Sequence, residues 1–293
     1  MTWFYLALIS AVFSALAAIS EKKALFKLDA LDFSFFVSIV TLIFSIPFFF
    51  DAPLDISLST PLIILFAKAI LSALAFLCVM LTIKNLEISE ALPLLALSPG
   101  LVAIFGVLLI QDTLVLNEWI GLFLMLVGTY ILELRKDDQS IFDPFKSLMR
   151  INKYKYVFFA LILFSITSLI DRVLLKDFKL PPYTFMAYQQ LFFALIFTTL
   201  ILFRNKKITA VIKPLNRNII YLIIIISVFT VVYRYTQIEA TKIAAVALVL
   251  SVKRLSVLMA ILIGGKLFKE SNVLKRAIAA VIILVGLIIL INN

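Results

Sequence analysis

Basic residues occur in this sequence within long apolar segments. Lys68, Lys253 and Arg254 lie near the middle of such segments, and Arg234 lies close to the end of another. A charge near the centre of a bilayer costs roughly 2.5–3.5 kcal/mol on insertion scales, so a charge kept there has a partner or a function. Basic groups at that depth can bind a carboxylate or a phosphate, and these four are candidate substrate-binding residues.

Two acidic residues, Glu21 and Asp171, lie near corresponding ends of two other apolar segments. A carboxyl at membrane depth that titrates can carry a coupling proton, so both are candidates for that role. The alternative is structural: buried acids and bases pair internally, for instance Asp171 with Arg172 or Arg254, and fix the helix packing. The sequence leaves both interpretations open.

Uncharged polar residues are further candidates for lining the same cavity. Gln189 and Gln190 follow Tyr188, and Gln237 comes one turn after Tyr233. Of these, Tyr188, Gln189 and Tyr233 are predicted to bind substrate. Hydrogen bonding between helices explains each of them equally well.

Proline and glycine mark places where a membrane helix can break. A proline frees backbone carbonyls, and transporters place binding sites and hinges at broken helices. The candidate hinge residues are Pro93, Pro99, Gly264 and Gly265.

The absence of some residue types excludes much chemistry. There is no histidine, and the single cysteine, Cys78, lies in an apolar segment as an expected filler. Histidine metal sites, histidine-ligated haem and Ser-His catalysis are excluded, and with no facing acids at mid-span we predict neither an enzyme nor a cofactor or metal. The net charge of +10 comes from basic residues that flank apolar segments, a pattern typical of membrane topology and lipid headgroups rather than nucleic acid.

The composition requires a membrane to position these side chains. Hydrophobic residues make up 63% of the chain, charged residues 15%, and the mean hydropathy is +1.14. Ten apolar blocks have about the length that a spanning helix needs. They are Trp3–Ser20, Phe33–Phe50, Pro61–Ile83, Ala91–Ile110, Trp119–Leu134, Tyr156–Leu175, Tyr183–Phe203, Ile219–Tyr235, Ile243–Ile263 and Ala277–Ile291. We therefore predict an all-α, multi-pass protein of the cell (plasma) membrane, with ten transmembrane helices.

The two halves of the sequence share landmarks in the same order. A shift of 150 residues lays Ser20-Glu21-Lys22 on Ile170-Asp171-Arg172, and a shift of 158 pairs Leu126-Val127-Gly128 with Leu284-Val285-Gly286. The shift grows along the chain, which indicates insertions in the second copy, and landmarks that recur in the same order indicate internal repeats.

These landmarks divide the chain into two five-helix repeats, residues 1–134 and 156–293, with a polar linker at 135–155. Because five is odd, the second repeat enters the membrane from the opposite side, and the repeats are inverted. Inverted repeats suit alternating access around a site at the midplane, and two fused halves can form a complete monomer.

The sequence resembles the EamA-type family of the drug/metabolite transporter superfamily over nearly its whole length. The residues that carry the resemblance are Ser98-Pro99, Glu118-Trp119-Ile120-Gly121 and Gly128 in the first half, with Ser251-Val252-Lys253-Arg254-Leu255-Ser256, Phe268-Lys269-Glu270 and Gly286 in the second. The chain departs from the usual pattern at Asp112, where glutamate is commoner, and at Val252, which replaces a proline. The resemblance implies ten helices in two repeats and the transport of metabolites such as amino acids, organic acids or sugar derivatives.

We therefore expect a secondary transporter that moves a small anionic or zwitterionic metabolite by alternating access, with a proton as the candidate coupling ion. The alternative is a lipid flippase or scramblase, because a basic groove open to lipid would also bind an anionic headgroup. A cation-exporting antiporter is disfavoured because the first apolar block, Trp3–Ser20, contains no acid. The expected partners are the solute and membrane lipid.

Charge and resemblance disagree about orientation. Loops after odd-numbered blocks hold 19 Lys and Arg, against 5 after even-numbered blocks when Arg172 and Arg234 at the block ends are counted. The positive-inside rule then places both termini outside the cytoplasm. The resemblance implies that both are inside.

Overall fold

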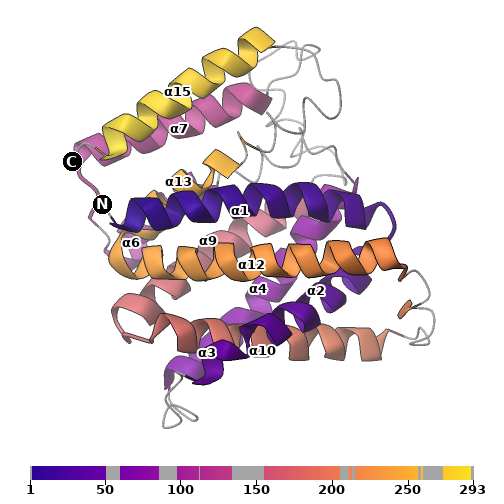
Figure 1. Ribbon diagram of the computed structural model, residues 1–293. Helices are drawn as coiled ribbons and strands as arrows, with labels where there is room; N and C mark the ends of the chain where they lie inside the picture. Colours follow the sequence, from indigo (N-terminus) through magenta and orange to yellow (C-terminus); the bar gives the residue numbers. More distant parts are fainter. Residues whose placement is uncertain are drawn as a thin grey trace.

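The protein is built from helices (Figure 1). The computed structural model describes residues 2–50, 60–85, 98–111, 113–133, 155–204, 211–212, 215–256, 259 and 273–291, which form eleven helices and no strand. The helices are α1 (Thr2–Leu25), α2 (Ala30–Ser45), α3 (Pro47–Phe50), α4 (Thr60–Asn85), α6 (Ser98–Ile110), α7 (Leu116–Glu133), α9 (Lys155–Lys176), α10 (Pro182–Phe203), α12 (Arg217–Ile243), α13 (Val246–Lys253) and α15 (Val273–Ile291).

The prediction of an all-α membrane protein is confirmed. Five helices, α1, α4, α9, α10 and α12, are long and apolar enough to cross a bilayer, and α2, α6 and α7 are shorter apolar helices. Each of the ten apolar blocks contains one helix, except that α2 and the four-residue α3 share a block. Many large apolar side chains on these helices are exposed, such as Phe50 and Leu109, as a lipid-facing surface requires.

Helix α12 is longer than its apolar block. It continues to Ile243, eight residues past the predicted end at Tyr235. Its last turns contain polar residues, but Gln237 and Thr241 are buried against other helices rather than exposed. Arg234 therefore lies inside the helix and not near its end as predicted.

Helix α13 is shorter than its apolar block. It ends at Lys253, and the backbone N–H of Arg254 caps it by bonding to the carbonyl of Leu250. Lys253 is the last residue of α13 and Arg254 forms a turn, after which Leu255 and Ser256 are helical again. The two basic residues therefore lie at a break in helical structure and not at the centre of an unbroken helix.

The helices pack in the pattern that two related repeats would give. In chain order α1, α2, α4, α6 and α7 correspond to α9, α10, α12, α13 and α15. The packing of α1 against α12 is repeated by α9 against α4, and that of α1 against α13 by α9 against α6. Three further contacts, α2 with α10, α6 with α13 and α7 with α15, join each helix to its own counterpart.

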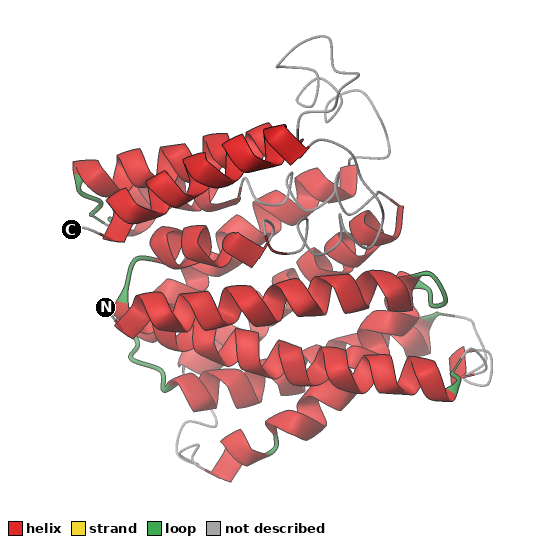
Figure 2. Cartoon of the chain, turned by 45° about the horizontal axis from the view of Figure 1, so that its top comes forward, coloured by secondary structure: helices red, strands yellow, loops and turns green. Residues whose placement is uncertain are grey.

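The pair α7 and α15 meets through glycines. A Cβ atom on Gly286 would lie 2.7 Å from the carbonyl oxygen of Gly121, and one on Gly128 would lie 2.6 Å from Cγ1 of Ile283. Glycine therefore lets the two backbones approach closely, as is common between membrane helices. Figures 1 and 2 show this pair together at one edge of the bundle, and they show both chain termini at the same end.

Candidate functional site

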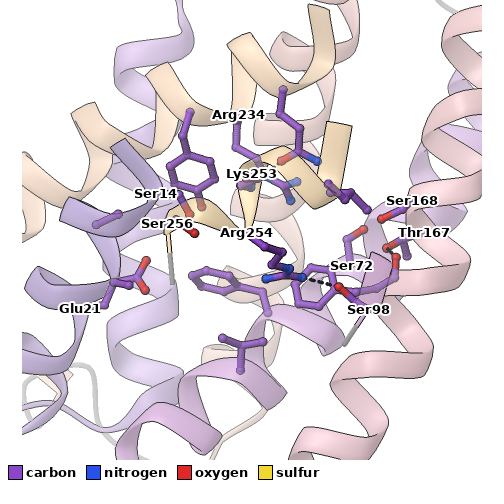
Figure 3. A pocket seen from close by; sticks show the side chains of 18 of the residues that line it. Ser14, Glu21, Ser72, Ser98, Thr167, Ser168, Arg234, Lys253, Arg254 and Ser256 are labelled. Atoms are coloured by element: carbon purple, nitrogen blue, oxygen red, sulfur yellow. Dashed lines mark hydrogen bonds between the residues drawn. The ribbon is translucent and has the colours of Figure 1, made fainter. Parts of the chain in front are cut away.

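A cavity of about 150 Å³ lies between the repeats, among α1, α4, α6, α9, α12 and α13 (Figure 3). Residues of both α1 and α9 line it, so these corresponding helices face each other across it. Six charged side chains also line it, and sequence analysis had singled out all of them: Glu21, Lys68, Asp171, Arg234, Lys253 and Arg254.

Lys68 of α4 is surrounded by partners. Its Nζ lies 2.6 Å from Oδ1 of Asp171 on α9 and 3.1 Å from Oε1 of Gln189 on α10, which accepts a hydrogen bond. The ring centroid of Phe185 lies 4.9 Å from the same nitrogen. With 1% of its side chain exposed, Lys68 carries a charge that is already balanced within the protein.

The basic residue that follows each acid, Lys22 after Glu21 and Arg172 after Asp171, donates a hydrogen bond to a carbonyl near the end of another helix. Arg172 donates from Nη1 to the carbonyl of Thr241 at 2.6 Å, and Lys22 donates to the carbonyl of Ile83. These carbonyls lie at the C-terminal ends of α12 and α4, two corresponding helices. Asp171 pairs with Lys68. The structural pairings suggested from the sequence, with Arg172 or with Arg254, are not found among the ion pairs of the described residues.

Lys253 and Arg254 reach the cavity from the end of α13. Lys253 donates to Oε1 of Gln237 at 2.6 Å, and its Nζ lies 4.5 Å from the ring centroid of Tyr233. Arg254 donates from Nη2 to the hydroxyl of Ser98 on α6, whereas its buried Nε has no hydrogen-bond partner. The guanidinium therefore retains donors for a further acceptor.

Glu21 and Arg234 make no ion pair or hydrogen bond with the residues that the structure describes. The cavity thus holds four basic and two acidic side chains, a formal excess of two positive charges. Across the described ranges no three His, Cys, Asp or Glu side chains lie close enough to hold a metal ion. The cavity lining is therefore positively charged overall.

Other predicted residues lie outside the cavity lining. Tyr188 packs its ring against Phe49 and Phe192, with centroids 5.6 and 6.2 Å away. Gln189 does not line the cavity, but it accepts a hydrogen bond from Lys68, which does. Tyr233, in contrast, lines the cavity.

The predicted hinges are described only in part. Pro99 lies at the start of α6, beside Ser98, which contacts Arg254. Pro93, Gly264 and Gly265 lie outside the described residues, as does Asp112.

Sequence analysis missed the hydroxyl groups of the cavity. Ser14, Ser72, Ser98, Thr167, Ser168 and Ser256 all line it. Serine and threonine are common in membrane helices, so nothing in their local sequence distinguishes these from hydroxyls that only bond within a helix.

Comparisons with known proteins agree with this architecture. The sequence profile of the EamA-like transporter family matches residues 1–134 and 152–292. No curated protein sequence matches the chain. One similar solved structure, titled "Crystal structure of protein", has 16% sequence identity to this chain. The match has a TM-score of 0.68 and covers 98% of this chain and 94% of the other chain. At this identity the similarity supports the fold alone.

Proposed function

This chain belongs to the EamA-like transporter family, and on that premise we propose that it is a secondary transporter for a small anionic or zwitterionic metabolite. The observation that carries the proposal is the excess of two positive charges around a cavity between the repeats. Unpaired charge in a membrane interior is costly, so a cavity with such an excess favours a solute of the opposite sign.

Arg254 is the proposed anchor for the anionic group. Its planar guanidinium can hold a carboxylate or a phosphate at two points, and its Nε has no partner in the protein. Lys253, held by Gln237, supplies a second positive charge, with Arg234 and Tyr233 beside it. Lys68, already paired with Asp171, balances charge within the protein and fixes the packing of α4 against α9.

The proposed mechanism is alternating access, in which the two repeats rearrange around the cavity. Ion pairs between the repeats must break and form as the protein changes state. Asp171 is engaged by Lys68, whereas Glu21 has no such partner among the described residues. If a proton drives transport, Glu21 is therefore a better candidate than Asp171 for the group that carries it.

The first experiment is a thermal-shift screen of the purified protein against anionic, zwitterionic and cationic metabolites. A solute that binds only the folded state raises the melting temperature, by mass action. The proposal predicts shifts with anions or zwitterions. Shifts with cations alone would contradict it.

Reconstitution then separates solute transport from lipid movement, because a lipid flippase would use the same basic groups for a headgroup phosphate. Liposomes loaded with the stabilising solute should release it through the protein. Movement of labelled anionic lipid without release of solute would favour the flippase instead. We propose the cell membrane as the location and the monomer, with both repeats in one chain, as the working unit.

A further inference from the structure

Hydroxyl groups on the described helices differ in the partners that they have, and a few outside the cavity, such as those of Thr41 and Thr184, have none. Away from the cavity they commonly donate to the carbonyl four residues earlier in the same helix, as Ser34, Ser165 and Ser251 do at 2.8 Å. This is the usual arrangement in membrane helices, where no water satisfies the group. Four serines in the cavity make no hydrogen bond with any residue that the structure describes: Ser14, Ser72, Ser168 and Ser256.

Three of these serines are buried as well as unpartnered. Their exposed fractions are 1% for Ser72, 7% for Ser168 and 8% for Ser256. These serines line the cavity and do not bond to the carbonyl of their own helix, so their hydroxyls are available to a molecule bound in the cavity. In the view of Figure 3, Arg254 lies between Ser14 and Ser256 on one side and Ser72 and Ser168 on the other.

From these groups we infer that the cavity binds a hydroxylated organic anion, such as a small sugar acid or sugar phosphate. The inference rests on the proposed anion site at Arg254 and specifies the rest of the solute. A serine hydroxyl both donates and accepts a hydrogen bond, and so does a solute hydroxyl, whereas an ammonium group only donates. Serines on α4 and α9, one from each repeat, are therefore matched to a polyol chain that extends from the anionic group.

The size of the cavity fits this class. Its volume of about 150 Å³ is smaller than the roughly 300–1,000 Å³ of sites for drug-sized ligands. A compact, polar solute fits a cavity of this size.

Matched pairs of solutes test the inference. Glycerate and propionate have the same carboxylate and the same number of carbons, and only glycerate carries hydroxyls. Glycerol 3-phosphate and propyl phosphate form the corresponding pair for a phosphate. Binding of each to the purified protein is measured by thermal shift and by competition, and we expect the hydroxylated member to bind roughly tenfold tighter in the pair with the correct anion.

Variants then assign the preference to particular serines. Ser72→Ala with Ser168→Ala should remove the preference for the hydroxylated solute while leaving the weaker binding of its deoxy partner. Ser165→Ala is the control, because Ser165 is a buried serine of the same helix as Ser168 but bonds to Leu161 and does not line the cavity. It should keep the preference.

Each remaining outcome is informative. Equal binding of hydroxylated and deoxy anions would overturn the inference and leave the anion site standing, with the serines holding water. Absence of binding by all four anions would overturn both. If the double variant still prefers the hydroxylated solute, groups other than Ser72 and Ser168 bind the hydroxyls of the solute, and this result also contradicts the inference.

Discussion

Nζ of Lys68 lies 2.6 Å from Oδ1 of Asp171, and this ion pair joins α4 of the first repeat to α9 of the second. Glu21 occupies the position in α1 that corresponds to Asp171 in α9, yet it has no ion pair within the described residues. Two repeat-related acids thus have different surroundings. In an alternating-access protein with inverted repeats, each end-state must be asymmetric in this way, because symmetric halves would open both sides equally.

Removing one partner of this pair should destabilise the protein. Lys68→Met leaves the Asp171 carboxylate buried and uncompensated, which we expect to cost about 3–5 kcal/mol of unfolding free energy. The melting temperature of the purified variant in detergent measures the effect.

Removing both partners should restore much of that loss. Apolar replacement of a whole buried ion pair is often neutral, so Lys68→Met with Asp171→Leu should melt higher than Lys68→Met alone. A double variant that is less stable than either single variant would show that the two side chains are not coupled.

Glu21→Gln should change coupling and not stability. Its carboxylate has no hydrogen bond or ion pair among the described residues, so the neutral amide should fold equally well. If Glu21 carries the proton, uptake in the variant should lose its pH dependence. The charged groups that share the cavity with it are Lys68, Asp171, Arg234, Lys253 and Arg254. Unchanged pH dependence in Glu21→Gln with Asp171→Asn would end the proton-coupling proposal for both acids.

Gly286→Ala should separate α7 from α15. The new Cβ would meet the backbone carbonyl of Gly121, which cannot move aside, and overpacking of this kind costs roughly 1–3 kcal/mol. The control is Gly100→Ala, whose Cβ would meet only the end of the flexible Leu126 side chain. Equal melting temperatures for the two variants would contradict the close backbone contact.

Orientation can be tested with a reporter fused to the C-terminus that fluoresces only in the cytoplasm. The excess of basic residues in the loops after the odd-numbered apolar blocks predicts that the cells stay dark. Bright cells would place the C-terminus inside, as the family resemblance implies.

Hydropathy was sufficient to locate the helices, because a spanning helix must be apolar over most of its length. It misplaced the end of α12, since Gln237 and Thr241 are polar but buried by neighbouring helices, a fact of tertiary packing. Hydropathy also did not indicate that α13 ends at Lys253, because the sequence is apolar on both sides of Lys253 and Arg254.

The charged residues of the cavity could be predicted because charge at membrane depth is rare and costly. Their pairing could not, because Lys68 and Asp171 are 103 positions apart and only the fold brings α4 beside α9. The cavity serines could not be predicted from the sequence for a different reason. What distinguishes Ser72 and Ser168 is the hydrogen bond that they do not make, and that is visible only in three dimensions.

The central claim, that Arg254 binds the anionic group of the solute, is tested most directly by measuring uptake and melting temperature together in Arg254→Met and Arg254→Lys. The solute is the one that the thermal-shift screen identifies. Losing two charge-assisted hydrogen bonds should weaken binding by on the order of 100-fold in Arg254→Met. Arg254→Lys keeps the charge but not the planar donors, so it should recover only part of the binding.

Stability distinguishes this role from a structural one. Because Arg254 has no acidic partner among the described residues, Arg254→Met should fold at least as stably as the unaltered protein. The account predicts lost uptake with an unchanged or raised melting temperature in Arg254→Met. Normal uptake in that variant, whichever way its melting temperature moves, would contradict it.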